Sequence, residues 1–288
     1  MTIHEGMIKL ARKLSWQASL GLIVLVCFVL MAIFAPQLTT HDPTKIAIVN
    51  RMIPPSWHDG GVPEHFLGTD ALGRDILTRL IFGSRVSILV AITATFVAGS
   101  IGVIIGLISG YYGGLVDDAL MRLADIQAAF PFILLAIAVL AVLGPGLVNL
   151  ILVLGIAGWV PYGRIVRGQV KSLREREFVE AAAALGARPF QIIFRHVLPN
   201  CWGPVIVLAS FSAARTIITE ASLSFLGLGV PPAIPSWGAM LADGREYLSL
   251  SPWLATYPGI TIMVMVLSIN LLGDWIRDIL DPRLRDSG

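Results

Sequence analysis

The chain is short of charge. Only 14% of its 288 residues are Asp, Glu, Lys or Arg, and 56% are hydrophobic. A typical soluble domain carries about 25% charged residues. This composition excludes an ordinary soluble domain and indicates a protein that crosses the lipid bilayer several times. The net charge is only +2, and the basic residues are spread over several loops, so we expect no nucleic-acid partner.

The sequence also lacks the motifs of several enzyme classes. No Gly-Lys dipeptide is present, so there is no Walker A loop, and no Gly-x-Ser-x-Gly elbow is present either. The histidines lie outside the apolar runs, and no pair has zinc-ligand spacing on a helix. The cysteines Cys27 and Cys201 lie in or beside different apolar runs, where packing is their default role. We expect no catalytic residue, no metal and no cofactor.

Apolar runs predict six transmembrane helices. We place them at about 16–36, 86–111, 119–143, 147–162, 201–228 and 253–275. The remaining divisions are a polar N-terminus at 1–15, a long loop at 37–85, a five-helix core at 86–276 that includes a charged loop at 163–200, and a tail at 277–288.

The long loop ends in a charged segment. Four Leu and Ile residues between positions 72 and 80 share one helical face, which predicts an amphipathic helix lying in the membrane interface before the second span. For Asp70, Arg74 and Asp75 we favour helix capping and local ion pairing over substrate contact.

Small and aromatic residues mark packing positions. Glycines at every fourth residue from 102 to 110 predict close approach of another helix to the second span. Pro131 predicts a kink in the third span. Trp237 and Trp253 fit a belt at the membrane interface.

The charged loop contains two short helices. The first has a short apolar face and is followed by Gly186, a natural stop. Pro189 suits the start of the second helix, and Pro199 its end. The apolar face is too short to span a bilayer, so it must lie on the protein's own loops, the lipid surface or a partner. Its members are Phe178, Ala181, Ala182 and Leu185.

Several sequence blocks resemble one family. Glu180-Ala181-Ala182, followed by Gly186 and Leu198-Pro199, resembles the EAA loop of ABC-transporter inner-membrane permeases. Blocks at 67–75, 219–229, 235–238, 270–274 and 281–284 are similar to the C-type permease of dipeptide, oligopeptide and nickel importers. The order and number of these blocks make the resemblance more specific than the EAA loop alone.

The resemblance implies an all-α membrane protein of the type I ABC importer class, with six transmembrane helices and a cytoplasmic coupling-helix loop. It further implies a heterodimer with a second homologous permease, two cytoplasmic ATPase subunits and an extracytoplasmic substrate-binding protein. The pathway would carry di- or oligopeptides, with nickel as the alternative. The residues that it assigns to ATPase coupling are Phe178, Glu180, Ala181, Ala182, Leu185 and Gly186.

Charge distribution predicts the orientation. Both termini and loop 163–200 share the side with more basic residues, so we expect that side to face the cytoplasm of a bacterial inner membrane. Asp117, Asp118 and Asp125 lie near the ends of spans, where we expect them to be solvated.

Two ionisable residues fall inside the fifth apolar run. Arg215 and Glu220 are candidates for the translocation pathway, and intramembrane charges also occur in ion-coupled secondary transporters, a weaker alternative. The family usually has a small or apolar residue at the position of Arg215. Three roles stay open for this arginine: lining the pathway, pairing with an acid of the second permease, or snorkelling to the interface.

Overall fold

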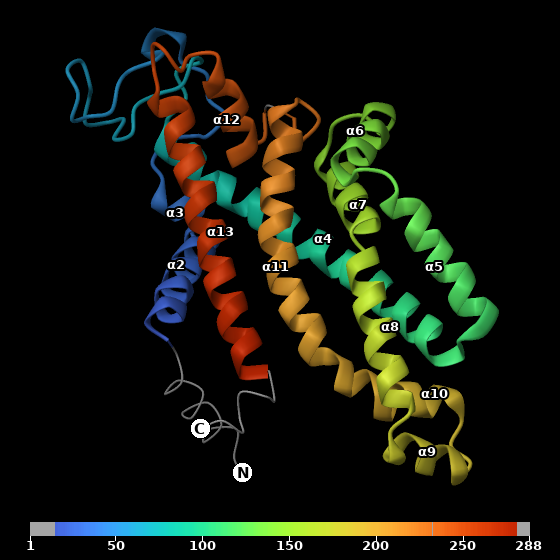
Figure 1. Ribbon diagram of the computed structural model, residues 1–288. Helices are drawn as coiled ribbons and strands as arrows, with labels where there is room; N and C mark the ends of the chain where they lie inside the picture. Colours follow the sequence, from blue (N-terminus) through green and yellow to red (C-terminus); the bar gives the residue numbers. More distant parts are fainter. Residues whose placement is uncertain (1–14, 232, 281–288) are drawn as a thin grey trace.

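The computed structural model describes residues 15–231 and 233–280. Within these residues the regular structure is helical, and a single isolated bridge joins Thr69 and Asp75 (Figure 1). The elements are α2 (Trp16–Ile33), α3 (Ala35–Leu38), the 3₁₀ turn η1 (Ile48–Asn50), α4 (Ile76–Tyr112), α5 (Gly114–Ala128), α6 (Phe132–Leu143), α7 (Leu147–Ala157), α8 (Val160–Arg174), α9 (Glu177–Ala184), α10 (Pro189–Ile192), the π-helix η2 (Ile193–Val197), α11 (Leu198–Phe225), α12 (Trp237–Arg245) and α13 (Trp253–Leu280).

Five helical segments are long and apolar enough to cross a membrane: Trp16–Ile33, Ile76–Tyr112, Leu147–Arg174, Pro189–Phe225 and Trp253–Leu280. The sixth candidate is the pair α5–α6, which is bent by 83°. Pro131 stands at the N-cap of α6, so the predicted kink is a complete break in the helix. The six apolar runs are therefore found as helices, and the third run is a bent pair.

Helix α4 is the long central element. In Figure 1 it runs diagonally across the molecule, with α2 at one end, α11 crossing near its middle and α8 along its other end.

The predicted interfacial helix is wrong: residues from Ile76 onward are the first turns of α4, and Arg79 and Ser84 there are buried by protein. The predicted capping and ion pairing of the charged segment are confirmed, because Asp75 caps α4 at the Thr78 amide and Asp70 pairs with Arg74, whereas the predicted lack of substrate contact stays a prediction.

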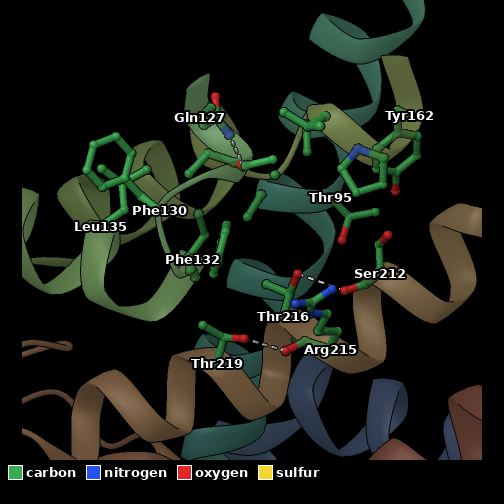
Figure 2. A pocket seen from close by; sticks show the side chains of 18 of the residues that line it. Thr95, Gln127, Phe130, Phe132, Leu135, Tyr162, Ser212, Arg215, Thr216 and Thr219 are labelled. Atoms are coloured by element: carbon green, nitrogen blue, oxygen red, sulfur yellow. Dashed lines mark hydrogen bonds between the residues drawn. The ribbon is translucent and has the colours of Figure 1, made fainter. Parts of the chain in front are cut away.

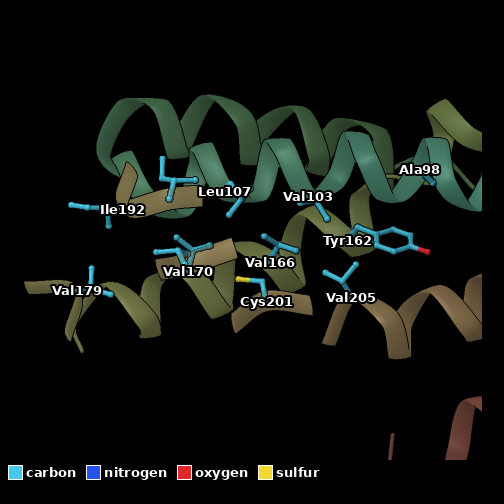
Figure 3. Packing of buried hydrophobic residues seen from close by; sticks show 12 residues of the cluster. Ala98, Val103, Leu107, Tyr162, Val166, Val170, Val179, Ile192, Cys201 and Val205 are labelled. Atoms are coloured by element: carbon cyan, nitrogen blue, oxygen red, sulfur yellow. The ribbon is translucent and has the colours of Figure 1, made fainter. Parts of the chain in front are cut away.

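The glycine positions of α4 form the contact with α8, as predicted. A Cβ atom on Gly106 would lie 2.7 Å from both the carbonyl oxygen of Gly163 and the Cβ of Val166. Such a short distance means that the two backbones are in direct contact. Figure 3 shows the valines of α8, including Val166 and Val170, packed beneath α4. In a membrane, where lipid is as apolar as leucine, this close van der Waals packing holds helices together.

Three further expectations are corrected. The fourth span does not end at residue 162, because α8 continues to Arg174 along α4. Pro199 does not end the second short helix; η2 leads directly into α11, and Pro199 lies in the first turn of α11. Trp237 is fully buried, and its Nε1 donates a hydrogen bond to the Leu80 carbonyl at 3.0 Å, so it is not part of an interface belt.

The N-terminal segment 1–14 and the tail 281–288 lie outside the described residues, so the expected cytoplasmic N-terminus and most of the expected tail fall there. The remainder of the predicted tail, residues 277–280, is the last turn of α13.

The contact of α4 with α8 can be tested with one methyl group. Gly106→Ala should lower the thermal midpoint of the detergent-solubilised protein, because overpacking against a backbone costs about 1–3 kcal/mol. Gly168→Ala on α8 is the matched control: a Cβ there has open space, and alanine favours the helix by about 1 kcal/mol. Equal midpoints for the two variants would contradict the close packing.

Candidate coupling surface and membrane cavity

The two short helices of loop 163–200 are fixed to the spans. We call α9, the turn at 185–188 and α10 the coupling bracket. Val179 of α9 and Ile192 of α10 are buried, and both belong to the same apolar cluster as Val170 of α8 and Val197 of η2 (Figure 3). One buried side chain from each short helix thus anchors the bracket to the base of two spanning segments.

The outer side of the bracket is apolar and uncovered. Leu185 is 89% exposed and Phe178 is 45% exposed. Phe190 of α10 is also exposed, and its ring centroid lies 4.3 Å from that of Phe194, an exposed residue of the adjoining η2. The predicted apolar face is therefore divided: Ala182 packs against the protein's own cluster, whereas Phe178, Ala181 and Leu185 are exposed.

The turn of the bracket depends on Gly186. Its φ is +84°, in the left-handed region that favours glycine. The amide of Ala187 donates to the Ala182 carbonyl, and the amide of Gly186 donates to the Ala183 carbonyl, the paired bonds of a Schellman motif. Glu180 is exposed in the first turn of α9, where a negative charge is favourable.

A buried carboxylate supports the helix that carries the bracket. Asp117 of α5 is only 4% exposed and accepts hydrogen bonds from Arg167 and Lys171 of α8 and from Ser109 of α4. The expectation that Asp117 is solvated is wrong, because α8 extends past the predicted end of its span and covers it. Sequence reasoning missed this cluster, although Arg167 and Lys171 share one face of a helix at i and i+4. Asp118 and Asp125 are exposed, as expected.

A cavity of about 390 Å³ lies between α4, the α5–α6 bend, α7–α8 and α11 (Figure 2). Arg215 of α11 lines it, together with Thr95 of α4 and Tyr162 of α8. The α5–α6 bend contributes Phe130 and Phe132. Its volume is within the range of roughly 300–1,000 Å³ that is typical of small-ligand sites.

Glu220 does not line this cavity. It is fully buried and accepts a hydrogen bond from Ser224 at 2.8 Å and one from Ser87 of α4 at 3.4 Å. These bonds join α11 to α4. The two predicted pathway residues therefore do not share a site, and a pathway role for Glu220 stays a prediction.

A second cavity, of about 650 Å³, lies at the opposite end of the molecule from the bracket, between the start of α4, the end of α11, and α12. Arg74 and Arg79 line it and are held by Asp70 and by Asp243 of α12. The part played by Asp243 could not be recognised from the sequence, because it lies in a different segment of the chain.

Together, the apolar spans and the bracket at one end define a multi-pass α-helical membrane protein. Its fold is similar to that of a solved chain described as inward-facing conformations of the MetNI methionine ABC transporter. The TM-score is 0.55 at 19% identity, and the match covers 70% of this chain and 96% of that chain. This likeness establishes the fold as that of a type I ABC importer permease.

Sequence comparison then gives the family. Residues 102–286 match the model of the binding-protein-dependent transport system inner membrane component, and residues 16–55 match the N-terminal transmembrane domain of oligopeptide transport permease C. The chain is 44% identical to the dipeptide transport system permease protein DppC of Alkalihalophilus pseudofirmus, over 93% of this chain and 86% of that relative. It is 42% identical to the oligopeptide transport system permease protein OppC of Bacillus subtilis, with the same two coverages.

The chain belongs to the family of binding-protein-dependent transport system inner membrane components. It is a permease subunit of an ABC importer, and the resemblance found in its sequence blocks is confirmed. It is thus a transport subunit rather than an enzyme.

The support beneath the bracket gives a second prediction. Asp117→Asn should destabilise the protein by about 1–3 kcal/mol, because it removes the carboxylate that Arg167 and Lys171 share. Thermal unfolding in detergent measures the loss. The neighbouring Asp118→Asn removes an exposed carboxylate and should have little effect. If both variants unfold at the wild-type temperature, Asp117 does not support α8.

Proposed function

We propose that this chain forms, with a second homologous permease, the membrane pathway for di- and oligopeptides in an ATP-driven importer. Two cytoplasmic ATPase subunits supply the energy, and an extracytoplasmic binding protein delivers the peptide. The observation that carries the peptide assignment is the 44% identity, over 93% of the chain, to a relative named as a dipeptide permease. Other relatives are also named for peptides, which favours peptide over nickel as the substrate.

The coupling bracket is the proposed contact with an ATPase. Its large exposed apolar side chains, Phe178, Leu185 and Phe190, lie on a short segment whose inner side is anchored in the protein, so movement of the bracket would be passed to α8 and α11. Glu180 adds an exposed negative charge to the first turn of α9, where a basic group of an ATPase could pair with it. A rigid, apolar and locally acidic surface suits transmission of force from a soluble partner.

The proposed orientation places the bracket in the cytoplasm of a bacterial cell and residues 39–75 outside, with both termini cytoplasmic. This orientation follows from the excess of basic residues on the bracket's side. It leaves the cavity beside Arg74 and Arg79 facing the binding protein.

Cysteine labelling tests the orientation. In a background without Cys27 and Cys201, a cysteine at Ser172 should react with a membrane-impermeant maleimide only after the cells are opened, and a cysteine at Asp59 should react in intact cells. Both side chains are exposed, so both sites are accessible to the reagent. The reverse pattern would overturn the proposed orientation.

Coupling is tested at the turn and at the charge of the bracket. Gly186→Val forces a β-branched residue into a left-handed turn at a cost of at least about 1 kcal/mol, and Glu180→Lys reverses the charge in the first turn of α9. Neither change touches the buried anchors Val179 and Ile192. We expect near-normal membrane abundance, weaker co-purification of the ATPase with tagged permease, and uptake of peptide reduced about tenfold or more.

The matched control for the coupling variants is Gly203→Ala in α11, where an added Cβ has open space and the backbone is helical. It should retain both ATPase and uptake. Should Gly186→Val and Glu180→Lys also retain both at wild-type levels, the bracket is a linker and the ATPase contacts another surface.

A further inference from the structure

We propose that the cavity beside Arg215 binds the C-terminal carboxylate of the peptide during its passage through the membrane. This inference deepens the proposed function and depends on it. It assigns to this chain a part in substrate selection, in addition to that of the binding protein.

Arg215 lies near the middle of a spanning helix. With a rise of about 1.5 Å per residue, it is about 15 Å from the end of α11 at Phe225, and the hydrocarbon core of a bilayer is about 30 Å thick. A guanidinium at this depth is costly unless it is paired or serves a function. Among the described residues, no carboxylate forms an ion pair with Arg215, and its side chain is exposed at the cavity.

A hydroxyl group without a partner lies in the lining of the same cavity. Thr95 Oγ1 is buried and has no hydrogen-bond partner, whereas the Tyr162 hydroxyl points toward the side chain of Ser212. By contrast, the hydroxyls of Thr216 and Thr219 donate to carbonyl oxygens within α11. Figure 2 shows Thr95 and Tyr162 on the same side of the cavity, above Arg215. A buried donor without a partner costs about 1–3 kcal/mol, so the Thr95 hydroxyl calls for an acceptor that the chain itself does not supply.

The charged residues that line the cavity favour a negatively charged ligand. Its lining residues include no Asp or Glu, and its second cation, Arg164, is already paired with Asp125 at 2.7 Å. Arg215 is thus the cation available to a ligand. A carboxylate accepts hydrogen bonds at both oxygens and can engage a guanidinium through two parallel bonds, whereas an ammonium group would be repelled. The chemistry therefore fits the carboxylate end of a peptide.

The opposite wall of the cavity is apolar. Phe130, Phe132 and Leu135 come from the α5–α6 bend and lie across from the hydroxyl groups (Figure 2). A peptide held at Arg215 by its carboxylate would place its last side chain against this wall. The bend that breaks the third span thus supplies an apolar surface that accepts different side chains. Arg215 binds the C-terminal carboxylate, which all free peptides share.

Direct binding tests the inference without the binding protein. The purified complex of both permeases and the ATPases is equilibrated with radiolabelled trialanine, and unlabelled trialanine or trialanine amide is added as competitor. In the wild type, the amide should compete at least about tenfold more weakly than the free acid. Arg215→Gln should abolish this preference, and Arg215→Lys should retain part of it. Arg164→Gln, the matched cavity arginine, should leave the preference unchanged.

Removal of the Thr95 hydroxyl distinguishes a role in ligand binding from a role in stability. Thr95→Val removes a hydroxyl that has no partner, so the thermal midpoint should stay the same or rise, while the dissociation constant for trialanine should increase several-fold. A merely structural role for Thr95 would leave trialanine binding unchanged.

The outcomes are distinct. Absence of trialanine binding to the wild-type complex, equal competition by acid and amide, or an unchanged preference in Arg215→Gln would each overturn the carboxylate site. Loss of the second permease from the Arg215→Gln complex would show instead that Arg215 pairs with an acid of that subunit. Peptide uptake by the complete wild-type importer is measured separately, and failure there would overturn the proposed function itself.

Discussion

Close packing of α4 against α8 is the constraint on which the rest of the structure depends. In water, burial of apolar surface would drive this contact, but lipid offers an apolar surface of its own, so the gain must come from the fit. Gly106 lets the backbone of α8 approach, and Val166 and Val170 fill the space beside it. Once α8 is fixed along α4, the cavity at one end of the pair and the bracket at the other have defined positions.

Ionic contacts reinforce this packing at the cytoplasmic end that we propose. Asp117 joins α5 to two cations of α8, and Arg174 donates to the carbonyl of Tyr111 at the end of α4. The last turns of α8 are therefore held on two sides before the chain enters the bracket. Force applied at the bracket would meet a connected unit of α4, α5 and α8, as a coupling element requires.

The sequence predicted the features that depend on local composition. Apolar runs located the six spans, Gly186 located the turn of the bracket, and the glycines of α4 located its tightest contact. It could not show features that depend on distant segments. Trp237 is a typical belt residue until Leu80 and Phe28 are known to surround it, and Asp117 looks solvated until α8 is known to extend over it. Pro131 predicts the position of the bend in the third span but not its angle, which is 83° between α5 and α6, because proline indicates where a helix bends and not by how much.

The charged residues in the spanning helices differ in whether the chain itself supplies a partner for them. Glu220 is fully buried, yet two serine hydroxyls donate to its carboxylate, and the contact with Ser87 joins α11 to α4. Arg79 is equally buried and pairs with Asp70. Both groups have a partner inside the chain, although Nε and Nη2 of Arg79 are buried without a hydrogen bond. Arg215 differs, because it has no ion-pair partner among the described residues and lines a cavity beside the unpartnered hydroxyl of Thr95. A carboxylate ligand would give both the Arg215 guanidinium and the Thr95 hydroxyl the acceptor that each lacks in the empty protein.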